Sequence, residues 1–241
     1  MARPLDGAVA LVTGAGRGLG RAAALALAGL GAQVVATGRT QGALEETDDA
    51  VRAVGGAATL LPLDLADGAA VDMLGPSLFD RFGRLDILVH AAAELGRLTP
   101  ASHVQIQDWD AAMAAGVGAA LRLIRTTAPL LQAAPAGRAV FVTDARARDP
   151  RAYWGVYGAA KAAQEHLVLS WADEMRRTRV RINLFEPGPM ATRLRRLAYP
   201  GEDQAALPLP ATVTPALVTL CLPDTTRHGE IVRAQETGGP A

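Results

Sequence analysis

The sequence predicts an α/β fold: a doubly wound sheet of seven parallel strands with helices on both faces. Two observations predict it. Short apolar runs of strand length alternate along the 241 residues with longer segments rich in alanine, leucine and arginine, which is the order of a βαβ fold. The apolar runs are continuous rather than alternating with polar residues, as in strands that are covered on both faces.

The expected elements follow one another in this order. Strands are expected at Ala8–Thr13, Gln33–Thr37, Ala57–Leu63, Leu85–Ala91, Arg138–Thr143, Val180–Phe185 and Glu230–Arg233. The clearest helical segments are Arg21–Leu30, Asp108–Leu131 and Val156–Arg177. A stretch rich in proline and glycine, Glu186–Pro210, is interpreted as containing a substrate lid, within about residues 187–210. We expect one domain over residues 1–241, with a frayed tail at Thr237–Ala241.

Composition and charge argue against several classes of protein. The 24 basic residues equal the 24 acidic residues, whereas a nucleic-acid or anionic-membrane partner would favour a basic chain. No apolar run is long enough to cross a bilayer and the N-terminus shows no signal-peptide pattern, so we expect a cytoplasmic protein. Cys221, the single cysteine, is expected to be a small buried hydrophobe. The four histidines lack the spacing of metal ligands, so no metal site is expected.

The first expected strand runs into a glycine-rich turn, Thr13–Gly20, that directly precedes a helix. Glycines there let the backbone turn tightly and approach a pyrophosphate, which the free N–H groups and dipole of a helix N-terminus attract. This context favours a dinucleotide-binding Rossmann fold over a plain glycine-rich turn. The cofactor contacts expected from the turn are those of Gly14, Gly16, Arg17, Gly18, Leu19 and Gly20.

The ends of the second and third strands indicate which dinucleotide binds. The second strand ends at Arg39 without the acid that NAD-binding sites usually place there for the ribose 2′-hydroxyl. Arg39, flanked by Arg17, suits a 2′-phosphate instead, so NADP(H) is the expected cofactor and NAD(H) is less favoured. Two solvated surface arginines are the alternative. Asp64, after the third strand, is expected either to accept a hydrogen bond from the adenine amino group or to cap a helix.

One tyrosine and the only lysine of the chain form a candidate catalytic pair. Lys161 lies four residues after Tyr157 in an expected helix, so both side chains lie on one face, a turn apart. The ammonium group can then lower the pKa of the phenol and can also hold the nicotinamide ribose.

Together these motifs resemble the short-chain dehydrogenase/reductase family over nearly the whole chain. Thr13–Gly20 resembles its T-G-x-x-x-G-x-G loop, Asp64 its adenine-contacting acid, and Tyr157 with Lys161 its Tyr-x-x-x-Lys pair. Arg181–Asn183 and Pro187–Thr192 resemble its sixth-strand motif and its nicotinamide-contacting loop. The resemblance implies further cofactor contacts from Ala91, Pro187, Gly188 and Thr192.

The same resemblance implies an activity and an assembly. In the family, the tyrosine gives or takes the proton of a carbonyl/alcohol pair while the nicotinamide carries the hydride. A small carbonyl or alcohol substrate and a homodimer or homotetramer are therefore expected. Trp154–Tyr157 and Ala198–Asp203 further resemble an uncharacterised bacterial branch of the family, the YciK-like proteins.

Three positions depart from the family pattern. The motif N-N-A-G after the fourth strand is His90–Ala93. The asparagine of the catalytic tetrad, counted from Trp109, falls on Gly116. The tetrad serine, thirteen residues before Tyr157, is replaced by Asp144, which we therefore add to the candidate catalytic residues.

Asp144 changes the electrostatics of the expected site. A carboxylate about 4 Å from a phenolate repels it by roughly 4 kcal/mol at an effective dielectric constant near 20, enough to oppose the effect of the lysine. Three arrangements would avoid this: Asp144 is protonated and donates to a carbonyl, is paired with Arg146, Arg148 or Arg151, or turns away as a loop cap.

The sequence thus carries two functional hypotheses. The first is an NADP(H)-dependent oxidoreductase that interconverts a carbonyl and an alcohol. The second is a catalytically impaired dinucleotide-binding protein, a sensor or scaffold, which Gly116 and Asp144 favour. Two groups of arginines border the expected substrate mouth, Arg193, Arg195 and Arg196 after the nicotinamide loop and Arg146, Arg148 and Arg151 before Tyr157. They are interpreted as a solvated charged rim, and selection of an anionic substrate is the alternative.

Overall fold

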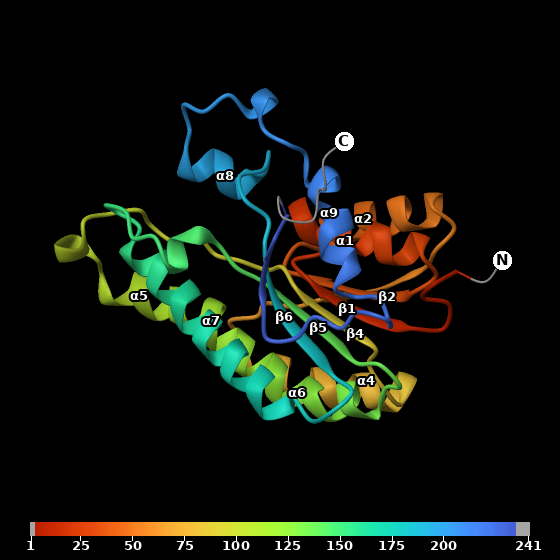
Figure 1. The fold of residues 1–241 in the computed structure, drawn as a ribbon. Coiled ribbons are helices and arrows are strands. Elements are labelled where there is room, and N and C mark those ends of the chain that lie inside the picture. Colours follow the sequence, from red (N-terminus) through yellow and green to blue (C-terminus); the bar gives the residue numbers. More distant parts are fainter. Residues whose placement is uncertain (1–2, 235–241) are drawn as a thin grey trace.

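Seven parallel strands form one sheet in the order β3-β2-β1-β4-β5-β6-β7, which confirms the predicted fold class (Figure 1). The computed structural model describes residues 3–234, so the tail expected at Thr237–Ala241 lies outside the described residues. The strands are β1 (Val9–Thr13), β2 (Gln33–Gly38), β3 (Ala58–Pro62), β4 (Ile87–His90), β5 (Arg138–Val142), β6 (Arg181–Glu186) and β7 (Ile231–Arg233).

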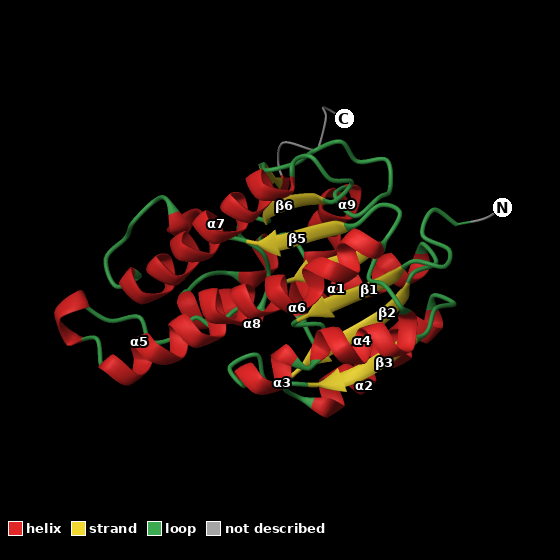
Figure 2. Cartoon of the chain, turned by 90° about the horizontal axis from the view of Figure 1, so that it is seen from below, coloured by secondary structure: helices red, strands yellow, loops and turns green. Residues whose placement is uncertain are grey.

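Helices cover both faces of this sheet, which makes the fold doubly wound (Figures 1 and 2). One face carries α1 (Gly18–Gly29), α2 (Gln41–Ala53) and α9 (Pro210–Thr219), and the other carries α4 (Leu74–Phe82), α6 (Ala119–Ala133) and α7 (Gly155–Met175).

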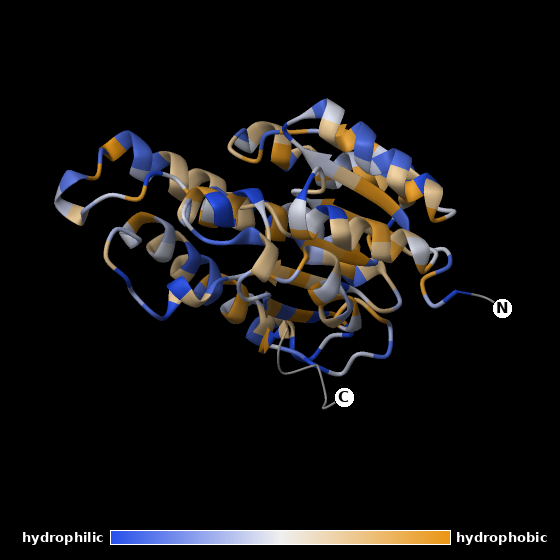
Figure 3. Ribbon diagram, turned by 90° about the horizontal axis from the view of Figure 1, so that it is seen from above, coloured by the Kyte–Doolittle hydropathy of each residue, from blue (hydrophilic) through white to orange (hydrophobic). Residues whose placement is uncertain are grey.

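Each face has its own hydrophobic core, because successive residues of a strand point to opposite faces. In β1, Ala10 and Val12 join the core under α1, while Val9 and Leu11 join the core under α6 and α7. Figure 3 accordingly shows hydrophobic strands between helices whose outer surfaces are more polar. Cys221 is a buried free thiol of the first core, as expected.

The remaining elements are short: α3 (Gly68–Asp72), α5 (Ile106–Met113), α8 (Arg193–Ala198) and the single turns η1 (Ala101–His103), η2 (Ala114–Gly118), η3 (Ala145–Ala147) and η4 (Gln204–Ala206). The helix expected without interruption over Asp108–Leu131 is instead α5, a π-helical turn at η2, and α6. Two glycines weaken the regular helix there, and a Cβ atom at Gly116 would lie 3.2 Å from Cβ of Ala160 in α7.

The chain order creates a switch point at the centre of the sheet. Connections from β1 run to β2 on one side, whereas β4 lies on the other side of β1, so the loops after β1 and β4 diverge above a crevice. The excursion after β6 carries α8 over this edge, and its base is closed by a 2.9 Å hydrogen bond from Ala191 N to the Pro208 carbonyl. Among residues 3–234, none of the helices combines the length and the apolar character that a membrane-spanning segment requires.

Candidate active site

One cavity of about 700 Å³ lies at the carboxyl edge of the sheet, and every candidate residue named from the sequence lines it. These are Gly14, Gly16, Arg17, Gly18, Leu19, Gly20, Arg39, Asp64, Ala91, Asp144, Tyr157, Lys161, Pro187, Gly188 and Thr192. The residues follow the ends of six strands, β1 to β6, or belong to the helices α1 and α7, so the sheet edge brings distant segments together. Nowhere in residues 3–234 do histidines, cysteines and acids gather into a cluster that could hold a metal ion.

The glycine turn has a shape that larger residues would destroy. Gly14 has a φ of +68° and a Cβ there would lie 2.8 Å from the Ala92 backbone, while a Cβ at Gly20 would lie 2.3 Å from the Gly14 carbonyl oxygen. The N-cap of α1 is Arg17, whose side chain does not cap the helix. The first N–H groups of α1 thus lie beside the cavity with no side-chain acceptor from their cap, an arrangement that fits the pyrophosphate of a dinucleotide.

The far end of the cavity contains an arginine with a carboxylate partner. The Arg39 guanidinium donates to the Glu94 carboxylate at 2.9 Å, and both side chains are exposed. Glu94 follows β4 at the same edge of the sheet, and sequence reasoning missed it although its place after a parallel strand is the signal for it. A 2′-phosphate that binds Arg39 would have to displace the Glu94 carboxylate from it.

Asp64 also lines this end of the cavity. Its carboxylate accepts a 3.0 Å hydrogen bond from Ala66 N in a local turn, and the cap of α3 is Asp67, which accepts from Ala70 N at 3.1 Å. The helix-cap alternative for Asp64 is therefore wrong.

The helix α7 brings the tyrosine–lysine pair to the cavity. Tyr157 and Lys161 are 5% and 6% exposed. The Tyr157 hydroxyl lies 3.4 Å from Oδ2 of Asp144, a long hydrogen bond. The Lys161 ammonium donates to the Val142 carbonyl at 2.8 Å and to Oε1 of Gln164 at 3.3 Å.

The electrostatics of the pair differ from the sequence-based expectation that Lys161 lowers the pKa of Tyr157. Burial raises the pKa of Tyr157, and the charge of Asp144 and its hydrogen bond with the phenol raise it further. Burial lowers the pKa of Lys161 to about 8, against the opposing attraction of Asp144 and Glu165. Burial and the adjacent Asp144 carboxylate explain why the neutral phenol is favoured.

Asp144 both caps a loop and faces the tyrosine. Its Oδ1 accepts from Arg146 N at 2.8 Å, which holds the first turn of η3, while Oδ2 faces Tyr157. The expected arginine partners are engaged elsewhere: Arg146 and Arg151 lie 3.1 and 3.4 Å from Asp149, and Arg148 binds two glutamates. The arginine-pairing alternative is therefore wrong, and the loop-cap alternative is right only for one carboxylate oxygen.

A buried polar network fixes the loop that carries Asp144. The Thr143 hydroxyl donates to Glu165, which also accepts from Arg148 at 2.9 Å, and Arg148 continues to Glu186 at the end of β6. Sequence reasoning missed Glu165, although its position four residues after Lys161 places it on the same face of α7, one turn deeper.

Aromatic side chains form a wall beside the tyrosine–lysine pair. The Trp154 ring lies 5.6 Å from the rings of both Tyr157 and Tyr199, and all three residues line the cavity. The Arg195 guanidinium lies 3.8 Å above the Tyr199 ring and binds Glu202 through two contacts of 2.6 and 2.5 Å. The interpretation of Arg195 as a solvated rim residue is therefore wrong, because its charge is compensated and stacked.

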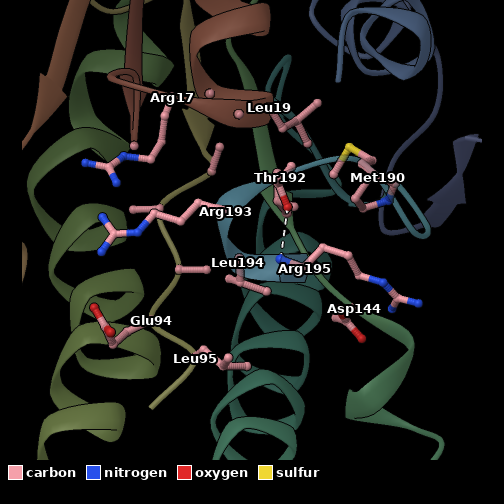
Figure 4. Close-up of a pocket in the computed structure, with 18 of the residues that line it drawn as sticks. Arg17, Leu19, Glu94, Leu95, Asp144, Met190, Thr192, Arg193, Leu194 and Arg195 are labelled. Carbon is pink, nitrogen blue, oxygen red and sulfur yellow. Dashed lines mark hydrogen bonds between the residues drawn. The ribbon is translucent and has the colours of Figure 1, made fainter. Parts of the chain in front are cut away.

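The arginines of the helix α8 point to different sides of the cavity. Thr192 caps it by accepting from Arg195 N at 3.2 Å, the dashed line of Figure 4. Figure 4 shows Arg193 on the side of Arg17 and Arg195 on the side of Asp144. The two ends of the cavity therefore have different electrostatic surroundings.

His90 stands at the first position of the segment that replaces the N-N-A-G motif of the family, and it is buried at the end of β4, between β1 and β5. Its Nδ1 is 2.8 Å from the Thr13 hydroxyl, and its ring meets Phe141 edge-on at 5.3 Å. Burial, and then the charge of Lys161, lower the pKa of His90 to about 3, so it is neutral at physiological pH. The histidine preserves a link between β1 and β4 at the switch point.

Comparison with known proteins identifies the family. The family model described as short chain dehydrogenase matches residues 8–203. The chain belongs to the short-chain dehydrogenase family. The Escherichia coli K12 oxidoreductase YciK, whose function is uncharacterised, is 33% identical over 226 residues, which cover 92% of this chain and 89% of YciK.

Solved members of the family have the same fold. A short chain dehydrogenase from Pseudomonas syringae is 36% identical, with a TM-score of 0.93 over 98% of this chain and 97% of that one. A short chain dehydrogenase from Escherichia coli CFT073, solved as a complex with NADPH, is 33% identical with a TM-score of 0.92 over 98% and 99% of the two chains. The resemblance to YciK-like family members is therefore confirmed.

The buried lysine gives a testable pH dependence of stability. The folded-state pKa of Lys161 is lower than its ordinary value of 10.5, so the folded protein loses this proton first as pH rises. The unfolded chain then binds more protons, and the contribution of Lys161 to the free energy of unfolding rises between about pH 8 and 10.5, by at most about 3 kcal/mol.

The measurement is urea unfolding of the wild type and of Lys161→Met at the two ends of this range. The stability of the wild type should increase relative to that of the variant as pH rises. Taking the difference cancels other groups that titrate there, such as Cys221. An equal pH dependence of both proteins would contradict the lowered pKa of Lys161.

Proposed function

We propose that this chain is an NADP(H)-dependent oxidoreductase that interconverts a small-molecule carbonyl and an alcohol, built as one NAD(P)-binding domain with a lid within residues 187–210. The observation that carries the proposal is one continuous cavity of about 700 Å³. It joins an anion-receptive helix N-terminus and Arg39 at one end to Tyr157 and Lys161 at the other. The NADPH complex of the Escherichia coli CFT073 relative supports the choice of cofactor.

Different residues of the cavity would hold different parts of the cofactor. The N–H groups at the start of α1 would hold the pyrophosphate, Arg39 the 2′-phosphate and Asp64 the adenine amino group. Lys161 would hold the nicotinamide ribose, with Pro187, Gly188 and Thr192 beside the nicotinamide. The bound nicotinamide supplies or accepts the hydride.

Tyr157 would supply the proton. Its hydroxyl is buried and its raised pKa keeps it protonated, which suits donation to a forming alkoxide, a stronger base than the phenolate. The same raised pKa opposes formation of the phenolate that alcohol oxidation requires. The site is therefore proposed to favour reduction of the carbonyl.

The second candidate is a dinucleotide-binding protein with little or no dehydrogenase activity, a sensor or scaffold. The observation that favours it is Asp144, whose carboxylate faces the Tyr157 hydroxyl where a hydroxyl donor is expected. The second departure is at Gly116, where the helix forms a π-helical turn but lacks the asparagine side chain of the family pattern.

Replacing Arg39 tests the choice of cofactor. A bidentate contact between a guanidinium and a phosphate discriminates by more than about tenfold, so the wild type should bind NADPH at least that much more tightly than NADH. In Arg39→Ala the two affinities should converge through loss of NADPH affinity. Fluorescence titration measures both. Arg52→Ala removes a charge from the outer part of α2, away from the cavity, and should leave the preference intact; a wild type with equal affinities contradicts the assignment.

Replacing Tyr157 separates the two candidate functions. Tyr157→Phe should lower reduction of a reactive diketone or quinone at least about a hundredfold, because it removes the proton donor, while NADPH affinity stays within a few fold. Tyr153→Phe, at an exposed tyrosine outside the cavity, is the matched control. If the wild type and both variants bind NADPH but none reduces a carbonyl, the binding-protein function replaces the oxidoreductase.

We further propose that the chain assembles as a homodimer or homotetramer. Ile106 and Trp109 of α5 and Leu121 of α6 expose large apolar side chains on the outer surface of one helical layer, which supports pairing with a symmetry mate. Light scattering at micromolar concentration should give a multiple of the 25.0 kDa chain mass. A monomeric mass at that concentration would refute the assembly.

A further inference from the structure

Asp144 and Tyr157 present two oxygen atoms to the cavity, 3.4 Å apart. An ionised carboxylate accepts hydrogen bonds and donates none. A substrate atom that contacts Asp144 must therefore carry a hydrogen that it can donate. A carbonyl oxygen has no such hydrogen, and its partial negative charge is repelled by the carboxylate. The nitrogen of a protonated imine has both the hydrogen and a positive charge.

The carboxylate of Asp144 is available for such a partner. Within residues 3–234 it forms no salt bridge, because its own contacts are the Arg146 backbone N–H and the Tyr157 hydroxyl. Arg146 and Arg195, two side-chain cations that line the cavity, form ion pairs with Asp149 and Glu202. Lys161 is buried and directs its hydrogens to the Val142 carbonyl and Gln164, and Arg193 lies on the side of Arg17 rather than on that of Asp144 (Figure 4).

The wall around Asp144 suits a planar organic cation. The rings of Tyr157, Trp154 and Tyr199 follow one another at 5.6 Å spacing along the same cavity. The guanidinium groups of Arg146 and Arg195 already lie 5.9 Å from the Trp154 ring and 3.8 Å from the Tyr199 ring, so the wall offers a substrate a surface against which a flat ring packs. A carboxylate at the end of an aromatic wall is thus complementary to a cyclic imine in its protonated form.

We propose that this site reduces the carbon–nitrogen double bond of a protonated cyclic imine, with Asp144 as the catalytic residue that accepts the iminium N–H. The proposal rests on the NADP(H)-dependent hydride transfer proposed above. It assigns to Asp144 a function that an impaired carbonyl reductase would lack.

The step balances without a general acid. The iminium carbon accepts a hydride with both its electrons from NADPH, which becomes NADP⁺, and the π pair of the C=N bond becomes the nitrogen lone pair of the amine. The iminium proton is already on the nitrogen and stays there, so Tyr157 need not transfer its own. Asp144 favours the protonated imine, which is the stronger hydride acceptor, and Tyr157 keeps the carboxylate oriented through its hydrogen bond.

The test compares dihydroisoquinoline, a cyclic imine, with tetralone, a ketone of similar shape, at saturating NADPH. The wild type should have a kcat/KM at least about tenfold higher for the imine. Asp144→Asn and Asp144→Ser should lower the imine value about tenfold or more, and the serine variant should raise ketone reduction by a similar factor. Asp173→Asn removes an exposed acid at the far end of α7 and should leave the ratio unchanged. A wild type that prefers the ketone, or a ratio that is the same in Asp144→Asn, overturns the proposal.

A binding measurement decides the case if no substrate turns over. Calorimetry with protonated tetrahydroisoquinoline and with neutral tetralol, with and without NADP⁺, should show that the wild type binds the amine at least about tenfold more tightly and that Asp144→Asn does not. Equal binding of both compounds overturns the role of Asp144. NADPH titration of the same samples reports separately on the proposed function, which fails if the cofactor does not bind.

Discussion

The hydrogen bond from the Lys161 ammonium to the Val142 carbonyl ties the long helix α7 to the end of β5, and the reactive end of the cavity depends on it. Asp144 lies two residues beyond Val142 and Tyr157 one turn before Lys161, so this contact fixes the distance between carboxylate and phenol. Gln164 supports it by donating to the same carbonyl at 3.1 Å. A lysine can stay in this buried position only because the carbonyl and an amide oxygen replace its water.

The same burial sets the chemistry of the site. It lowers the pKa of Lys161 and raises that of Tyr157, so the Tyr157 phenolate forms less readily than the spacing of the pair in the sequence indicates. Asp144 acts in the same direction. A neutral phenol beside a hydrogen-bond acceptor is suited to donate a proton, which is the basis of the proposed preference for reduction.

The mouth of the cavity is organised by ion pairs that neutralise its arginines. Arg195 is clamped by Glu202 and stacked on Tyr199, and Arg148 links Glu165 to Glu186 behind the η3 loop. These contacts leave Asp144 without an arginine partner although three arginines follow it closely in the chain. The formal net charge of the chain is zero and does not indicate the charge of the site. That charge depends on which arginines the glutamates pair with.

The sequence by itself determined the sheet, its strands and the edge at which the site lies, because these follow from local patterns. Continuous apolar runs predict buried parallel strands, the glycine turn predicts a helix N-terminus beside an anion, and a four-residue spacing places Tyr157 and Lys161 on one helix face. Only the tertiary structure decided the rest. The close approach of Gly116 to Ala160 of α7 and the pairing of Arg39 with Glu94 and of Arg148 with Glu165 all join residues that are distant in the chain. The state of Asp144 was left open by the sequence because it depends on which of its neighbours turn toward it, and long-range packing, rather than spacing, sets those directions.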